Sequence, residues 1–419
     1  MKVLLLILVS LFMAANGYVS YRNYKLYEVV PNVDQYDGFS AWEGAPGVDF
    51  FKRKSAGRAS TVLIAPEQQQ EFEAFLRLNN ILHNVIYQDY EVELEKEREQ
   101  MAETRKTKSA FKIDGQADFS VFWSFTEMQS YLLGLRDRFP NLIQVENLAF
   151  SPEGRPIYAI KVSSNPIFGQ RPIIAMETGM HAREWAAPPT TLYLIHKLVE
   201  DPVTSAELLA RVDWLIIPMQ NPDGYEFSRN TQRLWRQNRR NVTATCTGVD
   251  LNRNFAFTWR AATLSQPCGS QTYPGPSPLS EPEDYQLHHV VERYAGQVKM
   301  YLSVHTFGDL VLFPWGYTDA PGRIENWDEL VNVGNIWRDA VLAATGKDYY
   351  VVNSLEYFGN INGAVDDHML AIHGASITYT LELTDGFDFR YPEERILALA
   401  EETFIGYRSF GLYIGNRFG

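Results

Sequence analysis

The chain has 419 residues and a formal net charge of −13; 45% of its residues are hydrophobic and 21% are charged. This length exceeds that of a typical single domain, so we expect two folded units with ample material for a large core. The acidic balance, without a basic patch interleaved with aromatic residues, argues against nucleic acid and anionic membranes as partners, and we expect a monomer.

The first segment has the pattern of a signal peptide. Lys2 supplies a positive start, Leu4 to Ala15 form an apolar run, and Ala15-Asn16-Gly17 offers small residues for cleavage. The run is too short for a comfortable transmembrane helix, and no later segment is long and apolar enough to span a bilayer. We therefore expect residues 1–17 to be a signal peptide and the protein to be secreted and extracellular.

Residues 18–108 predict a small α+β unit. The expected elements are strands at Tyr24 to Val30 and Ser60 to Ala65, followed by a helix from Pro66 to Tyr87. The next stretch, Glu91 to Lys108, is almost entirely charged or polar, which is typical of either a solvated helix or a linker.

This charged stretch ends in Arg105-Lys106-Thr107-Lys108, which a trypsin-like protease would cut if the segment is exposed. Cleavage there would free a fragment that starts near Ser109. An ordinary helix between two domains would show the same composition, so these residues alone leave both interpretations open.

From Ser109 onward, strands and helices alternate, which predicts an α/β domain over residues 109–419. Several strands are nearly continuous apolar runs, as in mixed, mostly parallel twisted sheets that carry helices on both faces. Ser124 and Glu127 form a capping box at the start of one helix. The other expected strands are Ile157 to Val162, Pro172 to Glu177, Trp214 to Met219, Met300 to Val304 and Ser376 to Leu383, and the other expected helices are Pro189 to Glu200, Glu283 to Ala295, Trp327 to Ala344 and Glu393 to Phe410.

Only two cysteines are present, Cys246 and Cys268. In the oxidising compartment that a signal peptide implies, they would pair and close a loop. Two unpaired, buried thiols are the alternative.

His181 and Glu184 follow the apolar run Ile173 to Met176. In α/β sheets, ligands usually bind in the loops at the C-terminal ends of the strands. A spacing of three residues lets one turn direct both side chains to one point, and an imidazole nitrogen with a carboxylate oxygen suits Zn²⁺. A hydrogen-bonded surface pair is the alternative, so the spacing alone is a weak signal.

Two other strands end in residues that could complete such a site. His305 follows an apolar strand, and a third ligand from a distant strand would leave one zinc position open for water, as in catalytic zinc sites. Strand alternation places Glu382 on the face opposite its apolar neighbours, where it could act as a general base. The alternatives are a hydrogen-bonded core histidine and a solvated carboxylate.

Taken together, these groups resemble the zinc metallocarboxypeptidase family, in its A/B branch of secreted pancreatic and digestive enzymes, over nearly the whole chain. Residues 18–108 are similar to the family's α+β open-sandwich pro-domain and activation segment, and Cys246 and Cys268 match its disulfide pair. The motifs that carry the resemblance are His181 to Trp185, Asn221 to Tyr225, Leu234 to Arg236, Gly248 to Asn254, Ser303 to His305 and Leu381 to Leu383.

The resemblance implies a zymogen that a trypsin-like protease activates and that hydrolyses the C-terminal peptide bond of peptides and proteins with one zinc ion per chain. His181, Glu184 and His305 match the zinc ligands. Glu382 matches the general base that takes a proton from the zinc-activated water, and Arg236 matches the arginine that stabilises the developing oxyanion.

Four further positions match residues around the substrate and the metal. Asn252 and Arg253 match the pair that holds the free carboxylate of the substrate, which a guanidinium can grip with two hydrogen bonds. Arg183 matches another substrate-contacting arginine, and Asp250 matches the acid that orients His181.

The sequence departs from the family around the substrate pocket. Where the family has a mobile tyrosine, this sequence has Asn360, and Tyr357 is the nearest candidate for that role. Asp366 and Asp367 resemble the acidic pair of the B-type branch, so we expect Asp366 at the base of the pocket and a preference for basic C-terminal residues. A shift of one residue would place Asp367 there, and an A-type preference for apolar or aromatic residues would follow if Asp366 points away.

Two other functions compete with this interpretation. The altered tyrosine region would fit a catalytically silent binding protein on the same scaffold, but the zinc ligands, Arg236 and Glu382 are intact. A zinc hydrolase of small acylated amino acids would need neither a pro-domain nor the pair Asn252 and Arg253.

Overall fold

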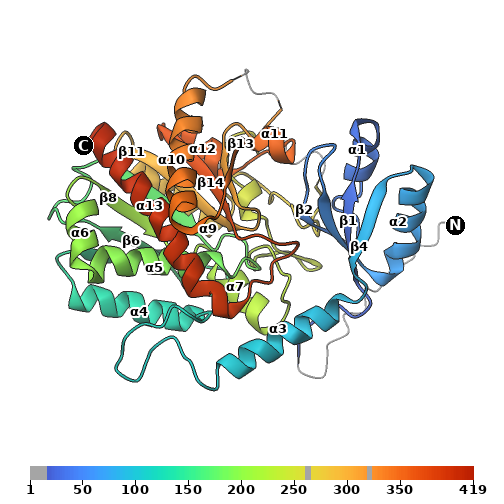
Figure 1. The fold of residues 1–419 in the computed structure, drawn as a ribbon, viewed down its shortest axis with the longest axis horizontal. Helices are drawn as coiled ribbons and strands as arrows, with labels where there is room; N and C mark the ends of the chain where they lie inside the picture. Colours follow the sequence, from blue (N-terminus) through green and yellow to red (C-terminus); the bar gives the residue numbers. More distant parts are fainter. Residues whose placement is uncertain (1–16, 260–265, 319–322) are drawn as a thin grey trace.

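The computed structural model describes residues 17–259, 266–318 and 323–419, which form a small N-terminal unit and a large C-terminal unit (Figure 1). Figure 1 shows the N-terminal unit in blue beside the larger one, with a long helix running between them. The predicted signal peptide, residues 1–17, lies outside the described residues except for Gly17. Within the described ranges, no helix is long and apolar enough to cross a bilayer.

The N-terminal unit is an antiparallel sheet of four strands, in the order β2-β3-β1-β4, with two helices packed against it. Side chains from both helices and from the sheet form one core, which includes Tyr27, Phe39, Val62 and Phe72. The elements are β1 (Lys25–Val30), α1 (Val33–Ser40), β2 (Val48–Lys52), β3 (Ser60–Ile64), α2 (Pro66–Leu78) and β4 (Leu82–Tyr87).

The helix predicted from Pro66 to Tyr87 is wrong beyond Leu78. The chain turns at Asn79 and Asn80, and Asn80 adopts a φ of 51°, which is incompatible with a continuing right-handed helix. Residues 82–87 then form β4 and pair with β1. The apolar residues after the turn keep a helical spacing, but pairing with a neighbouring strand decides their conformation.

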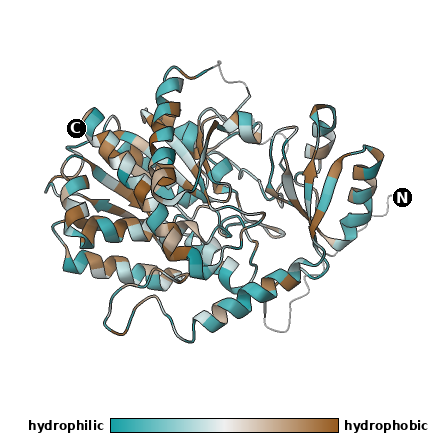
Figure 2. Ribbon diagram, in the orientation of Figure 1, coloured by the Kyte–Doolittle hydropathy of each residue, from teal (hydrophilic) through white to brown (hydrophobic). Residues whose placement is uncertain are grey.

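The charged stretch after β4 is a helix, α3 (Tyr90–Thr104), and Figure 2 shows it as largely hydrophilic. Two of its carboxylates pair with arginines of the C-terminal unit. Glu97 accepts two hydrogen bonds from the buried Arg233, at 2.7 and 2.9 Å, and Glu93 accepts one from Arg390 at 2.8 Å. These ion pairs hold a helix of low hydrophobicity against the larger unit.

The C-terminal unit is built on a mixed sheet of eight strands in the order β13-β12-β14-β11-β7-β8-β6-β5. The four central strands, β14, β11, β7 and β8, are parallel, and antiparallel pairs lie on both sides of them. The strands are β5 (Ile143–Phe150), β6 (Pro156–Val162), β7 (Ile173–Thr178), β8 (Asp213–Ile217), β11 (Val298–Thr306), β12 (Leu310–Phe313), β13 (Tyr350–Asn353) and β14 (Ile377–Leu383), with a separate pair β9 (Asn241–Thr243) and β10 (Cys246–Thr247).

Helices cover both faces of this sheet, as predicted. Along β7, Ile174 and Met176 face a core shared with α5, α10 and α13, whereas Ile173 and Ala175 face a core shared with α9 and α12. This alternation is that of a strand buried on both faces. The helices are α4 (Phe125–Arg138), α5 (Ala187–Glu200), α6 (Pro202–Leu208), α7 (Pro222–Asn230), α9 (Pro282–Glu292), α10 (Trp327–Thr345), α11 (Ser354–Phe358), α12 (Val365–Ala371) and α13 (Ile396–Phe418), with short 3-10 helices at η1 (Leu251–Arg253) and η2 (Glu393–Arg395).

The elements predicted for this unit are confirmed, with shifts at their ends. Ser124 and Glu127 form the predicted capping box of α4, and Cys246 and Cys268 form a disulfide. The last helix is longer than predicted and ends at Phe418. The outer strands β5, β12 and β13 and the short helices were not predicted. β12, β13 and the short helices carry too few residues for a clear period, and β5 is an outermost strand whose residues do not alternate regularly between buried and exposed.

Two glycines allow a matched test of helix packing. A Cβ on Gly406 in α13 would lie 2.3 Å from ring atoms of the buried Trp337, whereas a Cβ on Gly134 in α4 would meet nothing within 4 Å. We expect Gly406→Ala to lower the free energy of unfolding by about 1–3 kcal/mol through overpacking. Gly134→Ala should raise it by about 0.5–1 kcal/mol, because alanine favours the helix. Chemical denaturation of both variants measures this, and a loss at Gly134 as large as that at Gly406 would contradict the packing.

Candidate active site

Three of the predicted site residues meet at one edge of the sheet. The loop after β7 carries His181 and Glu184, and β11 carries His305, and the carboxyl ends of these parallel neighbours lie together. Nδ1 of His181 lies 2.8 Å from one oxygen of Glu184, and Nδ1 of His305 lies 2.9 Å from the other. Their ligand atoms all lie within 4.8 Å of one another.

Hydrogen bonds behind the two imidazoles fix their orientation. Nε2 of His181 lies 3.1 Å from Oδ1 of Asp250, and Nε2 of His305 lies 2.7 Å from the hydroxyl of Ser303. That hydroxyl donates to the buried Glu177, so it accepts from the His305 ring. Each Nε2 therefore carries the ring proton, and each Nδ1 presents a lone pair.

The two Nδ1 atoms lie 3.0 Å apart. Two lone pairs that face each other at this distance repel, and the buried carboxylate of Glu184 adds a negative charge. A cation between the three groups removes both costs. Two imidazole nitrogens and a carboxylate oxygen fit a zinc ion, and three protein ligands leave one position open, as in catalytic sites.

Glu382 lies beside His305, because the parallel register of β11 and β14 pairs these two residues. Its neighbours Leu381 and Leu383 belong to the core on the other face, as strand alternation predicted. Burial, and then the carboxylate of Glu184, raise the pKa of Glu382 to about 8. A carboxylate with a raised pKa next to a metal site is suited to taking and returning protons near neutral pH.

Asp250 holds two functional groups at once. One oxygen faces His181, and the other accepts from Nε and Nη2 of Arg236 at 3.1 and 3.0 Å. Burial would raise the pKa of Asp250, but Arg236 and Arg253 outweigh it and hold the pKa well below its usual range. Asp250 therefore stays ionised and fixes Arg236 near the metal ligands, a second role that the sequence did not reveal.

Three more predicted residues surround the same space. η1 places Asn252 and Arg253 side by side, and the side chain of Asn252 accepts from the backbone N–H of Val365 at 2.9 Å. Arg183 pairs with Asp49 of β2 at 2.6 Å. This guanidinium of the C-terminal unit is thus occupied by a carboxylate of the N-terminal unit.

Asp366 and Asp367 open α12 and point to different places. Asp366 lines the central cavity and accepts from the backbone N–H of Asp367 at 3.0 Å and from the hydroxyl of Thr380 at 3.2 Å. Asp367 accepts from the backbone N–H of Gly316 at 3.1 Å instead. Burial raises the pKa of Asp366, and its hydrogen bonds and His305 offset only part of this loss of solvation.

One cavity of about 130 Å³ is lined by His181, Glu184, Arg236, Asn252, Arg253, Asp366 and Glu382 of the C-terminal unit. Residues 49–53, which are β2 and the position after it, line the same cavity from the N-terminal unit. Lys52 of β2 reaches toward Glu382, and burial, followed by repulsion from Lys54, lowers the pKa of Lys52 to about 8. The N-terminal unit therefore covers the candidate site.

Tyr357 does not line this cavity. It packs in a small cluster with Leu310, Leu312 and Val352, and Arg58 of the N-terminal unit lies 5.1 Å from its ring centroid. Phe358 lines the cavity instead. A contact between Tyr357 and a substrate would require this tyrosine to leave its cluster.

The sequence did not reveal the supporting roles of Ser303, Glu177 and Thr380 or the contact made by Asp49. Ser303 stands within a motif and Glu177 ends the predicted strand Pro172 to Glu177, but their pairing depends on the register between β7 and β11. Thr380 shares a strand face with Glu382, and this was the available signal. The ion pair of Asp49 joins two units, so local sequence contains no sign of it.

Comparison with known proteins covers both units. A family model described as zinc carboxypeptidase matches residues 128–406, and one described as carboxypeptidase activation peptide matches residues 27–97. A carboxypeptidase B from Helicoverpa zea is 32% identical over 374 residues, which cover 86% of each chain. A carboxypeptidase B from Astacus astacus is 32% identical over 306 residues, which cover 72% of this chain and 99% of the relative.

The crystal structure of a carboxypeptidase A from Helicoverpa armigera matches with a TM-score of 0.88 and 28% identity, and the match covers 95% of this chain and 98% of that one. The shared fold extends over the C-terminal unit, the covering N-terminal unit and the helix between them. The chain therefore belongs to the zinc carboxypeptidase family, a family of hydrolases, and carries the activation peptide of a zymogen.

Proposed function

We propose that this zinc carboxypeptidase, once freed of its activation peptide, removes lysine and arginine from the C-termini of peptides and proteins. The observation that supports this preference is the carboxylate of Asp366 in the cavity wall. Among the described residues it has only neutral hydrogen-bond donors and no ion pair. A basic side chain of the substrate would supply the missing counter-charge, and a buried charge is stable only when it is paired.

The geometry of the site supports the following catalytic roles. His181, Glu184 and His305 hold the zinc ion, which when bound lowers the pKa of a water molecule and polarises a carbonyl group. Glu382 takes a proton from the attacking water and returns it to the leaving amine. Arg236, held in place by Asp250, stabilises the negative charge that develops on the carbonyl oxygen, an effect worth about 3 kcal/mol.

The restriction to free C-termini comes from Arg253 and Asn252. The guanidinium of Arg253 is buried at the cavity and donates one hydrogen bond, to the backbone oxygen of Asn252. Its remaining donors can grip a carboxylate in the two-pronged geometry that arginine favours. Arg183 becomes available to the substrate when Asp49 leaves, so the predicted contact belongs to the activated enzyme.

Activation would follow a cut close after α3, which separates a pro-domain and activation segment at 18–108 from a catalytic domain at 109–419. Arg105 is held by the backbone oxygen of Phe122 and by Glu127. Lys106 and Lys108 are exposed and lie in the turn after the helix. A trypsin-like protease would therefore cut after Lys106 or Lys108 rather than after Arg105.

We also propose that the enzyme is exported as a monomer and acts outside the cell. Residues 1–17 have the composition of a signal peptide. The disulfide between Cys246 and Cys268 suits an oxidising compartment, and a zymogen that awaits a trypsin-like protease suits the same location.

Glu382→Gln tests the general base. The amide keeps the shape of the side chain but cannot accept the proton, so we expect kcat to fall by about 10²–10⁴-fold while zinc content stays at that of the native enzyme. Metal analysis and peptide hydrolysis after trypsin treatment measure the two quantities. Glu394→Gln, at an exposed position, is the control, and full turnover by Glu382→Gln would remove this residue from the mechanism.

Asp366→Asn tests the preference for basic residues. Loss of the buried charge should lower kcat/KM for C-terminal Lys and Arg by about 30-fold or more and leave C-terminal Leu and Phe unchanged or improved. The matched variant Asp367→Asn, which loses the charge but keeps an oxygen that can accept from the backbone N–H of Gly316, should affect all four peptides alike. A native enzyme that prefers Leu or Phe, with no effect of Asp366→Asn on Lys and Arg, would establish an A-type preference.

Asp49→Asn tests whether the N-terminal unit inhibits the enzyme through its ion pair with Arg183. Without the charge that occupies Arg183, the released N-terminal fragment should inhibit the activated enzyme at least about tenfold more weakly. Asp34→Asn, at an exposed position of α1, is the control and should inhibit as well as the native fragment. Equal inhibition by all three fragments would show that this ion pair does not contribute to the block.

A further inference from the structure

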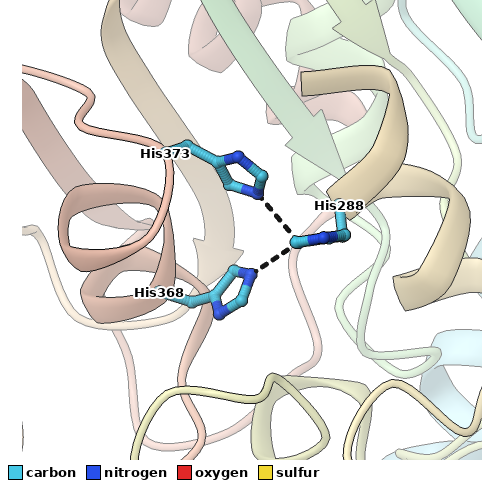
Figure 3. A group of neighbouring side chains, drawn as sticks. All are labelled: His288, His368 and His373. Carbon is cyan, nitrogen blue, oxygen red and sulfur yellow. Dashed lines mark hydrogen bonds between the residues drawn. The ribbon is translucent and has the colours of Figure 1, made fainter. Parts of the chain in front are cut away.

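A second group of histidines converges away from the active site. His288 lies on α9, His368 lies on α12, and His373 lies on the segment between α12 and β14. Figure 3 shows the three rings directed toward one another. Nδ1 of His288 lies 2.9 Å from Nε2 of His368 and 2.9 Å from Nε2 of His373. The three ligand atoms all lie within 4.8 Å of one another.

Hydrogen bonding alone cannot satisfy this arrangement. Both short contacts end on Nδ1 of His288, and a neutral imidazole nitrogen carries either one proton or one lone pair. It can therefore pair well with one neighbouring ring but not with two. The second close contact then has no proton or lone pair of His288 left to share. His368 is fully buried, His373 nearly so and His288 half-buried, so water can reach the group mainly from the side of His288.

We propose that His288, His368 and His373 bind a second zinc ion, separate from the one at the active site. In a tetrahedral site with zinc–nitrogen distances of about 2.0–2.1 Å, ligand nitrogens lie roughly 3.3–3.4 Å apart. The two 2.9 Å contacts need to open by only a few tenths of an ångström. The same signature, two ring nitrogens 3.0 Å apart, marks His181 and His305 at the active site.

Burial lowers the pKa of all three rings, which favours the neutral state that binds metal. Burial and the two neighbouring imidazoles lower the pKa of His368 to about 3. Burial and His288 lower the pKa of His373 to about 4. Burial and His289 lower the pKa of His288 as well. Three neutral imidazoles are a ligand set that suits Zn²⁺ among the abundant divalent ions, whereas Mg²⁺ and Ca²⁺ prefer oxygen.

The site is open on one side. Glu292 follows His288 by one turn of α9; its exposed carboxylate contacts His289 at 2.9 Å and lies close enough to act electrostatically on His288 and His373. It can complete the coordination or leave that position to water. Binding has one cost: the 3.4 Å contact between the backbone N–H of Phe257 and Nδ1 of His368 is lost, because Nδ1 must carry the proton when Nε2 binds metal.

The ion would link parts of the chain that carry the substrate pocket. Its ligands come from α9, from α12 and from the segment that enters β14. α12 begins with Val365 and Asp366 in the cavity region, and β14 carries Glu382. A metal at this position would cross-link α9 to α12 and so fix the helix that presents Asp366, which assigns the second ion a structural role.

Zinc counting on the purified full-length chain tests the proposal. After equilibration with micromolar Zn²⁺ and removal of unbound metal, the native chain should hold two zinc ions. His373→Asn and His288→Asn should each hold one zinc ion. Their affinity for the second ion should fall by at least about 100-fold, because the loss of a residue that only hydrogen-bonds to a metal ligand already lowers metal affinity by about 10–100-fold. His181→Asn should hold one, and His181→Asn/His373→Asn none, which separates the two sites.

His289→Asn is the matched control, because His289 is the exposed neighbour of His288 and pairs with Glu292 outside the group of three. It should keep two ions. A native chain with one zinc ion overturns the proposal, and so does a second ion that His289→Asn loses and His373→Asn retains. Circular dichroism checks that each variant folds. If neither His373→Asn nor His288→Asn folds, the zinc count of the native chain decides.

Discussion

At the edge of the parallel strands, two imidazole lone pairs and a carboxylate face one another, and this arrangement is stable only with a cation between them. Much of the molecule holds these three groups in place. Adjacent parallel strands bring His305 beside both Glu382 and the loop of His181. Asp250 and Ser303 fix the rings from behind. Without these supports the nitrogens could turn away from one another, so the fold itself maintains the affinity for a cation.

The cavity next to this centre is lined by both signs of charge. Arg236 and Arg253 line it together with Glu382 and Asp366. The proposed substrate, a peptide end with a free carboxylate and a basic side chain, also carries both signs of charge. This complementarity arises from a few residues in an otherwise acidic protein, so the net charge of −13 says little about what the site binds.

Local periodicity predicted the strands and the edge of the sheet at which the site lies. Strands such as β7 and β11 are continuous apolar runs, so His181, Glu184 and His305 could be expected at one edge of the sheet, whereas their roles as zinc ligands came from the resemblance to the family. The end of the helix that begins at Pro66 could not be predicted from local sequence. Residues 82–87 form a strand because they pair with β1, which is a contact between separate parts of the chain.

Contacts between distant parts of the chain were equally hidden. No local pattern shows that Asp49 would pair with Arg183, that Asp250 would hold two groups, or that His288 would meet His368. For Tyr357, in contrast, the sequence suggested a contact with the cavity that the structure does not contain. A resemblance suggested a role, but this side chain packs in a cluster with Leu310, Leu312 and Val352.

The ion pairs of α3 have a consequence for timing. A cut after Lys106 or Lys108 breaks the chain beyond Glu97 and Glu93, so both carboxylates keep their arginine partners on the larger unit. The N-terminal fragment would therefore remain bound after cleavage, and its dissociation would be a second step with its own rate. At high concentration, cleaved molecules would thus remain inactive, because each N-terminal fragment that dissociates soon rebinds. Dilution would prevent rebinding and so produce active enzyme.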